Sequence, residues 1–501
     1  MMGMLYTSTR GQTEMVCSAH AITRGLADDG GLFVPQKFPI VELEDILNLS
    51  NLSYSERASK IISLFLTDYT CDELKECMER AYSKEKFSGF AAPVKFVKDK
   101  TAVLELWHGP TSAFKDMALQ LLPYLMTLAA EKTGEENKLV ILVATSGDTG
   151  KAALEGFKNV KGTTVIVFYP EDGVSDIQKC QMITQQGDNV EVIAVKGNFD
   201  DAQSGVKSIF ADETLYERLK ENEFALSSAN SINWGRLVPQ IVYYFSAYAD
   251  AVKGGYINAG DEINFSVPTG NFGDILAGYY AKCMGLPVHR LICASNTNNV
   301  LADFFNTGKY DRRRDFHKTM SPSMDILISS NLERLLYHLT QGDAAKVATW
   351  MKDLKVTGFY NIDNNDLNKL QKTFFGTWVD EIETKETIGN VFRDKNYLLD
   401  PHTAVAWRAC DKYRMLSSDE RFCIVLSTAS PYKFNVSVLE AIKPECASHN
   451  LDPFAALEQL QELTGIEIPF NLRKLETQKV LHNKCIEKQG MKDMVLNILN
   501  L

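Results

Sequence analysis

Short apolar runs that alternate with helical patterns dominate the chain from Phe96 onward. Each run is rich in β-branched residues, and a cluster of Gly, Ser or Thr separates it from the helical pattern that follows. This order is typical of βα units in a parallel sheet. Strands are predicted at 139–144, 164–168, 263–267 and 422–426. The sequence therefore predicts an α/β fold with parallel or mixed sheets.

Three stretches depart from this regular alternation. Residues 1–90 have the pattern of a small mixed unit, and the stretch from about 310 to 396 is charged and mostly helical. The tail at 446–501 has the pattern of amphipathic helix. No low-complexity linker separates these parts, so we expect them to pack tightly. The predicted division is an N-terminal domain at 1–90, an α/β region at 91–445 that contains the helical insertion, and a C-terminal helical segment.

Size, composition and charge narrow the class of protein. The chain has 501 residues, of which 45% are hydrophobic and 23% charged, as in folded globular proteins with two or three packed units. Its 64 acidic residues outnumber its 53 basic residues and give a net charge of -11. We therefore expect no nucleic-acid partner. No apolar run reaches the roughly 18 residues of a membrane span, so no membrane insertion is expected either.

The first residues have no secretory pattern, so we expect a cytoplasmic protein whose ten cysteines stay reduced. These cysteines form no CxxC pair, and the eight histidines form no HExxH motif. The sequence therefore predicts no metal site.

Three loops at the predicted carboxyl ends of strands are candidate ligand sites. The loop at 269–274, TGNFGD, precedes a helix, so its backbone N–H groups and the helix N-terminus suit a phosphate. The loop at 145–151, TSGDTGK, lacks the spacing of a nucleotide P-loop but suits a small carboxylate or phosphate. The third, at 427–430, offers hydroxyl groups to a heteroaromatic nitrogen. For each loop, a tight turn or a helix cap that binds nothing is the alternative.

One lysine supplies a candidate reactive group. Lys115 begins a predicted helix that buries one side, and both burial and a helix N-terminus disfavour its ammonium form. A lysine with a lowered pKa is what imine formation requires. An ordinary surface lysine is the alternative, and the neighbouring Trp107, Pro110 and Phe114 argue against it.

Five segments in one order and spacing closely resemble threonine synthases of the long-chain type: HGPTSAFKD, ATSGDTG, SANSINWGR, PTGNFGDILAGYYAK and LSTASPYKF. The resemblance runs from Ser8 to about Leu439, and five ordered motifs are far more specific than one glycine-rich loop. It implies the fold of the tryptophan synthase β-subunit, in which two α/β domains hold pyridoxal 5'-phosphate (PLP). An N-terminal mixed α/β domain, here residues 1–90, precedes them.

The resemblance also implies roles for individual residues. The Schiff-base lysine of the family falls on Lys115, with Phe114 packing against the cofactor, and the hydroxyl for the pyridine nitrogen falls on Thr428. The loop for the cofactor phosphate falls on Gly270, Asn271, Phe272, Gly273 and Asp274. The loop for the substrate carboxylate contributes Thr145, Ser146, Asp148 and Thr149. The site for the phosphate of the substrate falls on Asn230, Ser231, Asn233 and Arg236. No metal is implied.

One position departs from the family pattern. Many relatives carry a histidine after the Thr-Ala pair of the last motif, where this chain has Ser430. The role of this corner of the site is therefore open, although Thr428 is retained.

The reaction implied by the resemblance converts O-phospho-L-homoserine and water to L-threonine and phosphate. Lys115 would be the base for the proton transfers, and we expect a monomer or a homodimer. Two alternatives remain: a related phospho-lyase that releases 2-oxobutyrate, and a catalytically silent binding homologue. The second would be expected to lack the reactive lysine or the phosphate loop, and both are present.

Overall fold

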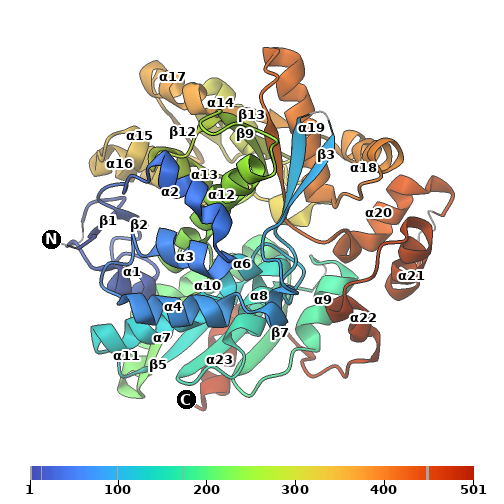
Figure 1. Cartoon of the computed structure of the whole chain (residues 1–501). Helices are drawn as coiled ribbons and strands as arrows, with labels where there is room; N and C mark the ends of the chain where they lie inside the picture. The colour runs from blue at the N-terminus through green and yellow to red at the C-terminus, as the bar shows by residue number, and fades with distance from the viewer. Residues whose placement is uncertain (1–2, 13, 99, 172, 447–450) are drawn as a thin grey trace.

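The computed structural model describes residues 3–501 except 13, 99, 172 and 447–450. It confirms the predicted α/β class: a six-stranded sheet occupies the upper half of Figure 1 and a five-stranded sheet the lower half. Each of the four predicted strands is present in one of these sheets. None of the helices formed by the described residues combines the length and apolarity of a membrane span.

The six-stranded sheet has the order β13-β10-β9-β14-β4-β3. Its strands run parallel except β3, which pairs antiparallel with β4. The strands are β3 (Val94–Lys98), β4 (Thr101–Glu105), β9 (Ile263–Pro268), β10 (Val288–Ser295), β13 (Phe374–Trp378) and β14 (Cys423–Ser427). The main helices around it are α12 (Trp234–Lys253), α13 (Gly273–Cys283), α14 (Val300–Thr307), α19 (Pro401–Ser417) and α20 (Asn435–Ile442).

Both faces of this sheet are buried, as its apolar strands require. Phe265 and Ile424 point into the core that contains α12 and α13. Ile292 and Val425 point to the other face, into the core that contains α19. Alternate residues of one strand therefore serve two different cores.

The five-stranded sheet has the order β15-β7-β6-β5-β8, and all its strands are parallel. The strands are β5 (Lys138–Ala144), β6 (Thr163–Pro170), β7 (Val190–Lys196), β8 (Phe224–Ser228) and β15 (Lys484–Glu487). The helices are α8 (Asp148–Phe157), α9 (Asp176–Ile183), α10 (Phe199–Phe210), α11 (Glu213–Glu221) and α23 (Met491–Leu499). β15 and α23 come from the C-terminal segment, so this tail contains a strand as well as the expected helices.

The first ninety residues lie on the left of Figure 1, beside both halves. A two-stranded antiparallel sheet and five α-helices are formed by the described residues of this part. They are β1 (Tyr6–Ser8), β2 (Phe33–Pro35), α1 (Ser18–Arg24), α2 (Leu43–Asn48), α3 (Tyr54–Ile62), α4 (Cys71–Ala81) and α5 (Lys84–Phe87). α3 and α4 each begin with a capping box, Ser53 with Glu56 and Thr70 with Glu73, which explains where they start.

The stretch at 310–396 is mainly helical but also contains strand β13 of the large sheet. Its helices are α15 (Leu332–Leu339), α16 (Ala344–Val356), α17 (Asn364–Thr373) and α18 (Glu381–Lys395), and a small antiparallel pair joins β11 (Lys309–Asp311) to β12 (Phe359–Asn361). Between α20 and β15, the described residues also form α21 (Pro453–Thr464) and α22 (Phe470–Arg473).

Candidate active site

A cavity of about 670 Å³ lies between the two large sheets, at the carboxyl ends of their strands. One part of its wall comes from the loops that follow β4, β5, β8, β9 and β14, as expected for a ligand site in parallel sheets, and further parts come from α10, α16 and the N-terminal residues. Of the sequence-predicted site residues, these line it: Phe114, Lys115, Thr145, Ser146, Thr149, Asn230, Ser231, Arg236, Gly270, Asn271, Phe272, Gly273, Asp274 and Thr428. Asp148 and Asn233 do not belong to its lining.

Two backbone hydrogen bonds join the loop that carries Lys115 to the residues that follow β14. The Phe114 N–H donates to the Thr428 carbonyl at 2.8 Å, and the Ser430 N–H donates to the Ser112 carbonyl at 3.1 Å. Lys115 then precedes α6 (Asp116–Leu119), a single turn that ends before α7 (Leu122–Thr133). The helix predicted after Lys115 is therefore interrupted, and the second piece carries Pro123 in its first turn, where a missing N–H is tolerated.

The amine of Lys115 has no hydrogen-bond or ion-pair partner among the described residues; its Nζ lies 4.4 Å from the centre of the Phe114 ring. Burial lowers the pKa of Lys115 to about 8. Asp148 and Asp274 oppose this change by attraction, whereas Arg236 and Lys433 add to it by repulsion. At a pKa of about 8, roughly a tenth of the molecules carry a neutral Lys115 at pH 7, far more than for an ordinary lysine. A nucleophile or base must be neutral.

The glycine loop after β9 is built for a close approach of its backbone. A Cβ on Gly270 would lie 2.5 Å from the Ser323 carbonyl oxygen, so this position has room for no side chain. Phe272 adopts a left-handed conformation with φ 64°, and its ring packs in the core against Phe305. The backbone of the loop, and not these side chains, is thus what can face an anion at the start of α13.

Asp274 points a carboxyl group toward two tyrosines of α12. Its Oδ1 accepts from the Tyr243 hydroxyl at 2.6 Å and from the Tyr244 hydroxyl at 2.9 Å, whereas Oδ2 has no partner among the described residues. Burial raises the pKa of Asp274 to about 6. An ionised carboxylate would repel a phosphate, so the contribution of Asp274 to an anion site is its backbone N–H.

The loop after β5 splits into residues that face the cavity and residues that hold the turn. The hydroxyls of Ser146 and Thr149 form no hydrogen bond with other described residues. Thr145 Oγ1 instead accepts from the backbone N–H groups of Gly147 at 3.0 Å and Gly150 at 2.8 Å. Asp148 pairs with Lys433. Only part of the predicted carboxylate loop is therefore free to bind a ligand through its side chains.

The segment after β8 also contains both a residue that holds the backbone and a residue that faces the cavity. Asn233 caps α12, because its Oδ1 accepts from the Gly235 N–H at 2.8 Å and its Nδ2 donates to the Ile22 carbonyl at 2.9 Å. Arg236, by contrast, is 3% exposed and has no carboxylate partner among the described residues. Its Nη1 donates to the Ala229 carbonyl, and its Nε has no partner. Burial lowers the pKa of Arg236 to about 10, and the guanidinium is available to an anion in the cavity.

The sequence predicts no role for two further residues of the site. His402, at the start of α19, lines the cavity, accepts from the Ser323 N–H at 3.2 Å and contacts Asp400 at 2.9 Å. Lys433 is fully buried in η3 (Pro431–Phe434), between the loops that carry Thr111 and Asp148. Lys433 lies within the motif LSTASPYKF, whereas His402 lies outside the five motifs, and only the fold brings the two residues to one site.

Ser430 occupies the position where many relatives have histidine. Its side chain accepts from the Tyr432 N–H at 3.4 Å and caps η3, and Ser430 is fully buried. Thr428, two residues earlier, lines the cavity, and its hydroxyl has no partner among the described residues. In this chain the corner therefore serves as a helix cap beside an available hydroxyl.

Three family models match the chain in succession. They are "Threonine synthase N terminus" over 5–82, "Pyridoxal-phosphate dependent enzyme" over 100–428 and "Threonine synthase, C-terminal" over 403–476. Threonine synthase from Pseudomonas aeruginosa is 40% identical over 460 residues, which cover 91% of this chain and 95% of that protein. The chain belongs to the threonine synthase family.

Other threonine synthase relatives extend this comparison. The crystal structure of PLP-bound threonine synthase from Brucella melitensis has a TM-score of 0.86 and 36% identity, with 99% of each chain covered. "Threonine synthase-like 1" from Pongo abelii is 42% identical over 437 residues. That alignment covers 85% of this chain and 58% of the relative, so the chain spans under two thirds of the length of that protein.

The cofactor of this family is PLP, and the residues of the cavity fit it. Lys115 offers an amine without a counter-ion, the loop after β9 offers backbone donors at the start of a helix, and Thr428 offers a neutral hydroxyl. These are the groups that an aldehyde, a phosphate and a ring nitrogen require. Among the described residues, no three His, Cys, Asp or Glu side chains are grouped so that they could hold a metal ion.

Proposed function

We propose that this protein is a threonine synthase that converts O-phospho-L-homoserine and water to L-threonine and phosphate. The observation that carries the proposal is the pairing, in one cavity, of an unpartnered lysine amine with a buried guanidinium that lacks a counter-ion. The amine suits PLP, and the guanidinium suits a second anion, namely the phosphate of the substrate. Sequence identity of 40% with a threonine synthase over most of both chains supports the same reaction.

The proposed roles assign PLP to one side of the cavity. Lys115 binds its aldehyde, the backbone from Gly270 to Asp274 binds its phosphate, and Thr428 donates to its ring nitrogen. Phe114 lies next to Lys115 on the cavity wall. When bound, PLP supplies an electron sink that acidifies the carbon atoms next to the substrate amine. Because Thr428 is neutral, it leaves the ring nitrogen largely unprotonated and thereby restrains transamination.

The proposed substrate groups occupy the rest of the cavity. Ser146, Thr149 and the backbone of their loop bind the carboxylate at the start of α8. Arg236, with Asn230 and Ser231, binds the phosphate and stabilises its charge as it departs. Nζ of Lys115 takes the proton from Cα and returns protons later in the reaction, since its lowered pKa suits a base near neutral pH.

A product assay tests this proposal. Purified protein with PLP is incubated with O-phospho-L-homoserine, and L-threonine, 2-oxobutyrate and phosphate are all quantified. We expect threonine and phosphate in equal amounts. 2-Oxobutyrate in place of threonine would assign the protein to the phospho-lyases, and no phosphate release would favour a silent binding homologue.

We also propose a cytoplasmic location and a monomeric or homodimeric state. The nine described cysteines are all free thiols, which supports a reducing compartment. Cell fractionation tests the location, and light scattering of the purified protein tests the assembly.

A further inference from the structure

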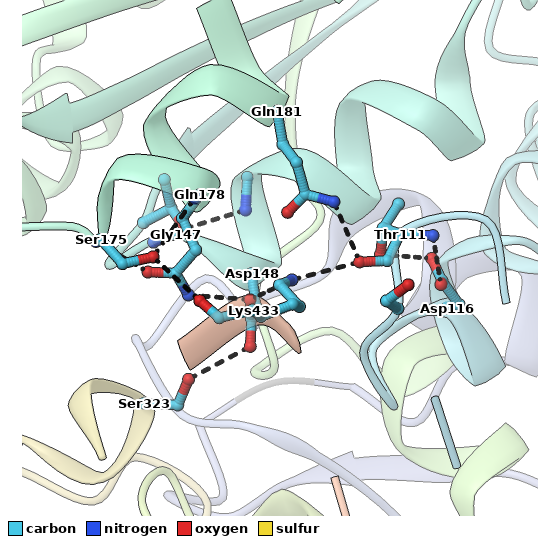
Figure 2. A network of polar contacts seen from close by, with 12 residues as sticks. Thr111, Asp116, Gly147, Asp148, Ser175, Gln178, Gln181, Ser323 and Lys433 are labelled. Carbon is cyan, nitrogen blue, oxygen red and sulfur yellow. Dashed lines mark hydrogen bonds and ion pairs between the residues drawn. The ribbon is translucent and has the colours of Figure 1, made fainter. Parts of the chain in front are cut away.

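A buried ion pair between Lys433 and Asp148 connects loops of the two sheets (Figure 2). Both charges act on Lys115. Lys433 Nζ is 2.5 Å from Asp148 Oδ1, and the two side chains are 0% and 3% exposed. Lys433 belongs to η3, after β14 of the six-stranded sheet, whereas Asp148 opens α8, after β5 of the five-stranded sheet. The pair therefore ties the proposed carboxylate loop to the loop that follows Thr428.

Both oxygens of the Asp148 carboxylate accept hydrogen bonds, and none of these comes from Lys115. Gln178 Nε2 donates to Oδ1 at 2.8 Å, and the Ser323 hydroxyl donates to Oδ2 at 3.4 Å. Burial opposes the charge, but Lys433, Lys115 and the hydrogen bond from Gln178 hold the pKa of Asp148 far below its usual range. Asp148 is therefore an anion with fixed partners, although it stands in a loop proposed to receive a carboxylate.

Lys433 also touches the turn that carries Lys115. Its Nζ donates to the Thr111 carbonyl at 3.1 Å. Thr111 in turn donates to both carboxylate oxygens of Asp116, from its N–H and from its hydroxyl, each at 2.8 Å. Asp116 directly follows Lys115. In Figure 2, Lys433 lies between Asp148 on one side and the Thr111–Asp116 turn on the other.

The position of Lys433 matters because Lys115 must reach its reactive form. A carboxylate free to turn toward Lys115 would stabilise the ammonium, which is neither a nucleophile nor a base. We propose that Lys433 is a positioning residue: by binding Asp148 it withholds that carboxylate from Lys115 and leaves the Lys115 amine without a counter-ion. The inference rests on the role of Lys115 in the proposed function.

The groups that face Lys115 fix the sign of the expected effects. They are Asp148 and Asp274, which raise its pKa, and Arg236 and Lys433, which lower it. Loss of the Lys433 charge leaves Asp148 unpaired, so the amine becomes harder to deprotonate. Loss of the Asp148 charge leaves Lys433 unpaired, so the amine becomes easier to deprotonate. Loss of both charges removes two opposing effects at once.

The experiment measures how fast the apo-protein captures PLP as a function of pH, followed by the visible absorption of the bound cofactor. Capture requires the neutral amine, so its pH midpoint reports the protonation of Lys115. We expect Lys433→Met to move the midpoint upward by about one pH unit and Asp148→Asn to move it downward by a similar amount. The double variant should return close to the wild-type midpoint. Lys151→Met, a change of a partly buried lysine on α8, should not move it.

The Lys115→Ala variant and the double variant separate the possible outcomes. Equal midpoints in the wild type, Lys433→Met and Asp148→Asn, with capture lost in Lys115→Ala, would overturn the inference but not the proposed function. Undiminished capture by Lys115→Ala would overturn the role of Lys115 and the inference with it. If Lys433→Met does not fold, Asp148→Asn and the double variant decide, because the double variant buries neither charge. Its midpoint must then lie above that of Asp148→Asn.

Discussion

Arg236 carries a positive charge that the protein buries without a counter-ion among the described residues. Such a charge is costly to the folded state, since burial removes its hydration and no carboxylate replaces it. The residue lies at the first turn of α12, beside the proposed phosphate subsite. We expect the buried guanidinium to bind a multiply charged ligand strongly, because little water enters the cavity to screen the two charges.

This gives a prediction for Arg236→Met. The KM for O-phospho-L-homoserine should rise by about 10- to 100-fold, because a hydrogen bond to a charged group contributes about 1.5–3 kcal/mol. The apo-protein should at the same time melt at a higher temperature, since a buried unpaired charge is removed. Steady-state kinetics and thermal unfolding measure the two effects. A loss of PLP affinity with unchanged KM would place Arg236 at the cofactor phosphate instead.

At this scale the sequence predicts which residues surround the site but not how each side chain is turned. Asp148 and Asn233 lie inside predicted motifs, yet neither lines the cavity. Asp148 is held by Lys433, 285 residues away, and Asn233 by the Ile22 carbonyl, 211 residues away. The spacing of residues within a motif does not reveal a hydrogen-bond partner so distant in the chain. Lys115 and Thr428 lie in motifs whose backbone follows a strand directly, so the sequence predicts their place at the cavity, whereas the charges around Lys115 come from distant segments.

Among the elements, α15 and α13 share an aromatic contact that makes the fold sensitive to acid. His338 of α15 and Tyr280 of α13 are joined by a hydrogen bond of 2.7 Å between Nε2 and the hydroxyl. Burial, together with repulsion from Arg334, lowers the pKa of His338 to about 3. The native protein therefore keeps this histidine neutral at pH values where an unfolded chain would protonate it.

The pH dependence of stability follows from that difference. As the pH falls below about 6.5, His338 binds a proton in the unfolded state, whereas in the native state it stays neutral until about pH 3. The free energy of unfolding should thus fall by about 1.4 kcal/mol per pH unit from this residue. His338→Gln should flatten the loss, measured by denaturant unfolding between pH 6.5 and 4.5. The exposed His317→Gln is the matched control, and an equal slope in all three proteins would refute the assignment.

Elements with a strong local pattern were predictable, and elements made by distant pairing were not. β5, β6, β9 and β14 follow from apolar runs that end in small-residue loops. β15 is a different case, because its residues are largely exposed and its strand form depends on pairing with β7. The break between α6 and α7 depends on one proline within an otherwise continuous apolar pattern.

Across the whole molecule, a bidentate contact ties the N-terminal residues to the helical stretch at 310–396. Glu333 of α15 accepts from Arg10 Nε at 2.9 Å, from Arg10 Nη2 at 3.0 Å and from the Thr9 hydroxyl at 2.6 Å. Glu333 is buried, whereas the Arg10 side chain is 29% exposed. Nearby, Arg334 donates to the Phe33 carbonyl of β2 at 2.9 Å. The N-terminal part is thereby fixed at the edge of the cavity, which Arg10 and Glu333 also line.

Glu333→Gln should destabilise the protein by about 1–2 kcal/mol, because it removes a buried, bidentate partner of a partly exposed arginine. Thermal unfolding measures the change. The matched control is Glu76→Gln, which breaks the exposed Glu76–Arg80 pair and should have an effect below about 0.5 kcal/mol. Equal effects of the two substitutions would mean that the contact with α15 adds no more than a surface ion pair.

The strand order of the large sheet has a consequence for synthesis on the ribosome. β14 (Cys423–Ser427) lies between β4 and β9, both of which are translated far earlier. Until β14 emerges, the two halves of this sheet have no strand to join them, and their inner edges stay open for a chaperone to shield. Lys115, the glycine loop and Thr428 follow β4, β9 and β14 in turn. A nascent chain therefore cannot load its vitamin-derived cofactor before β14 and Thr428 have been translated.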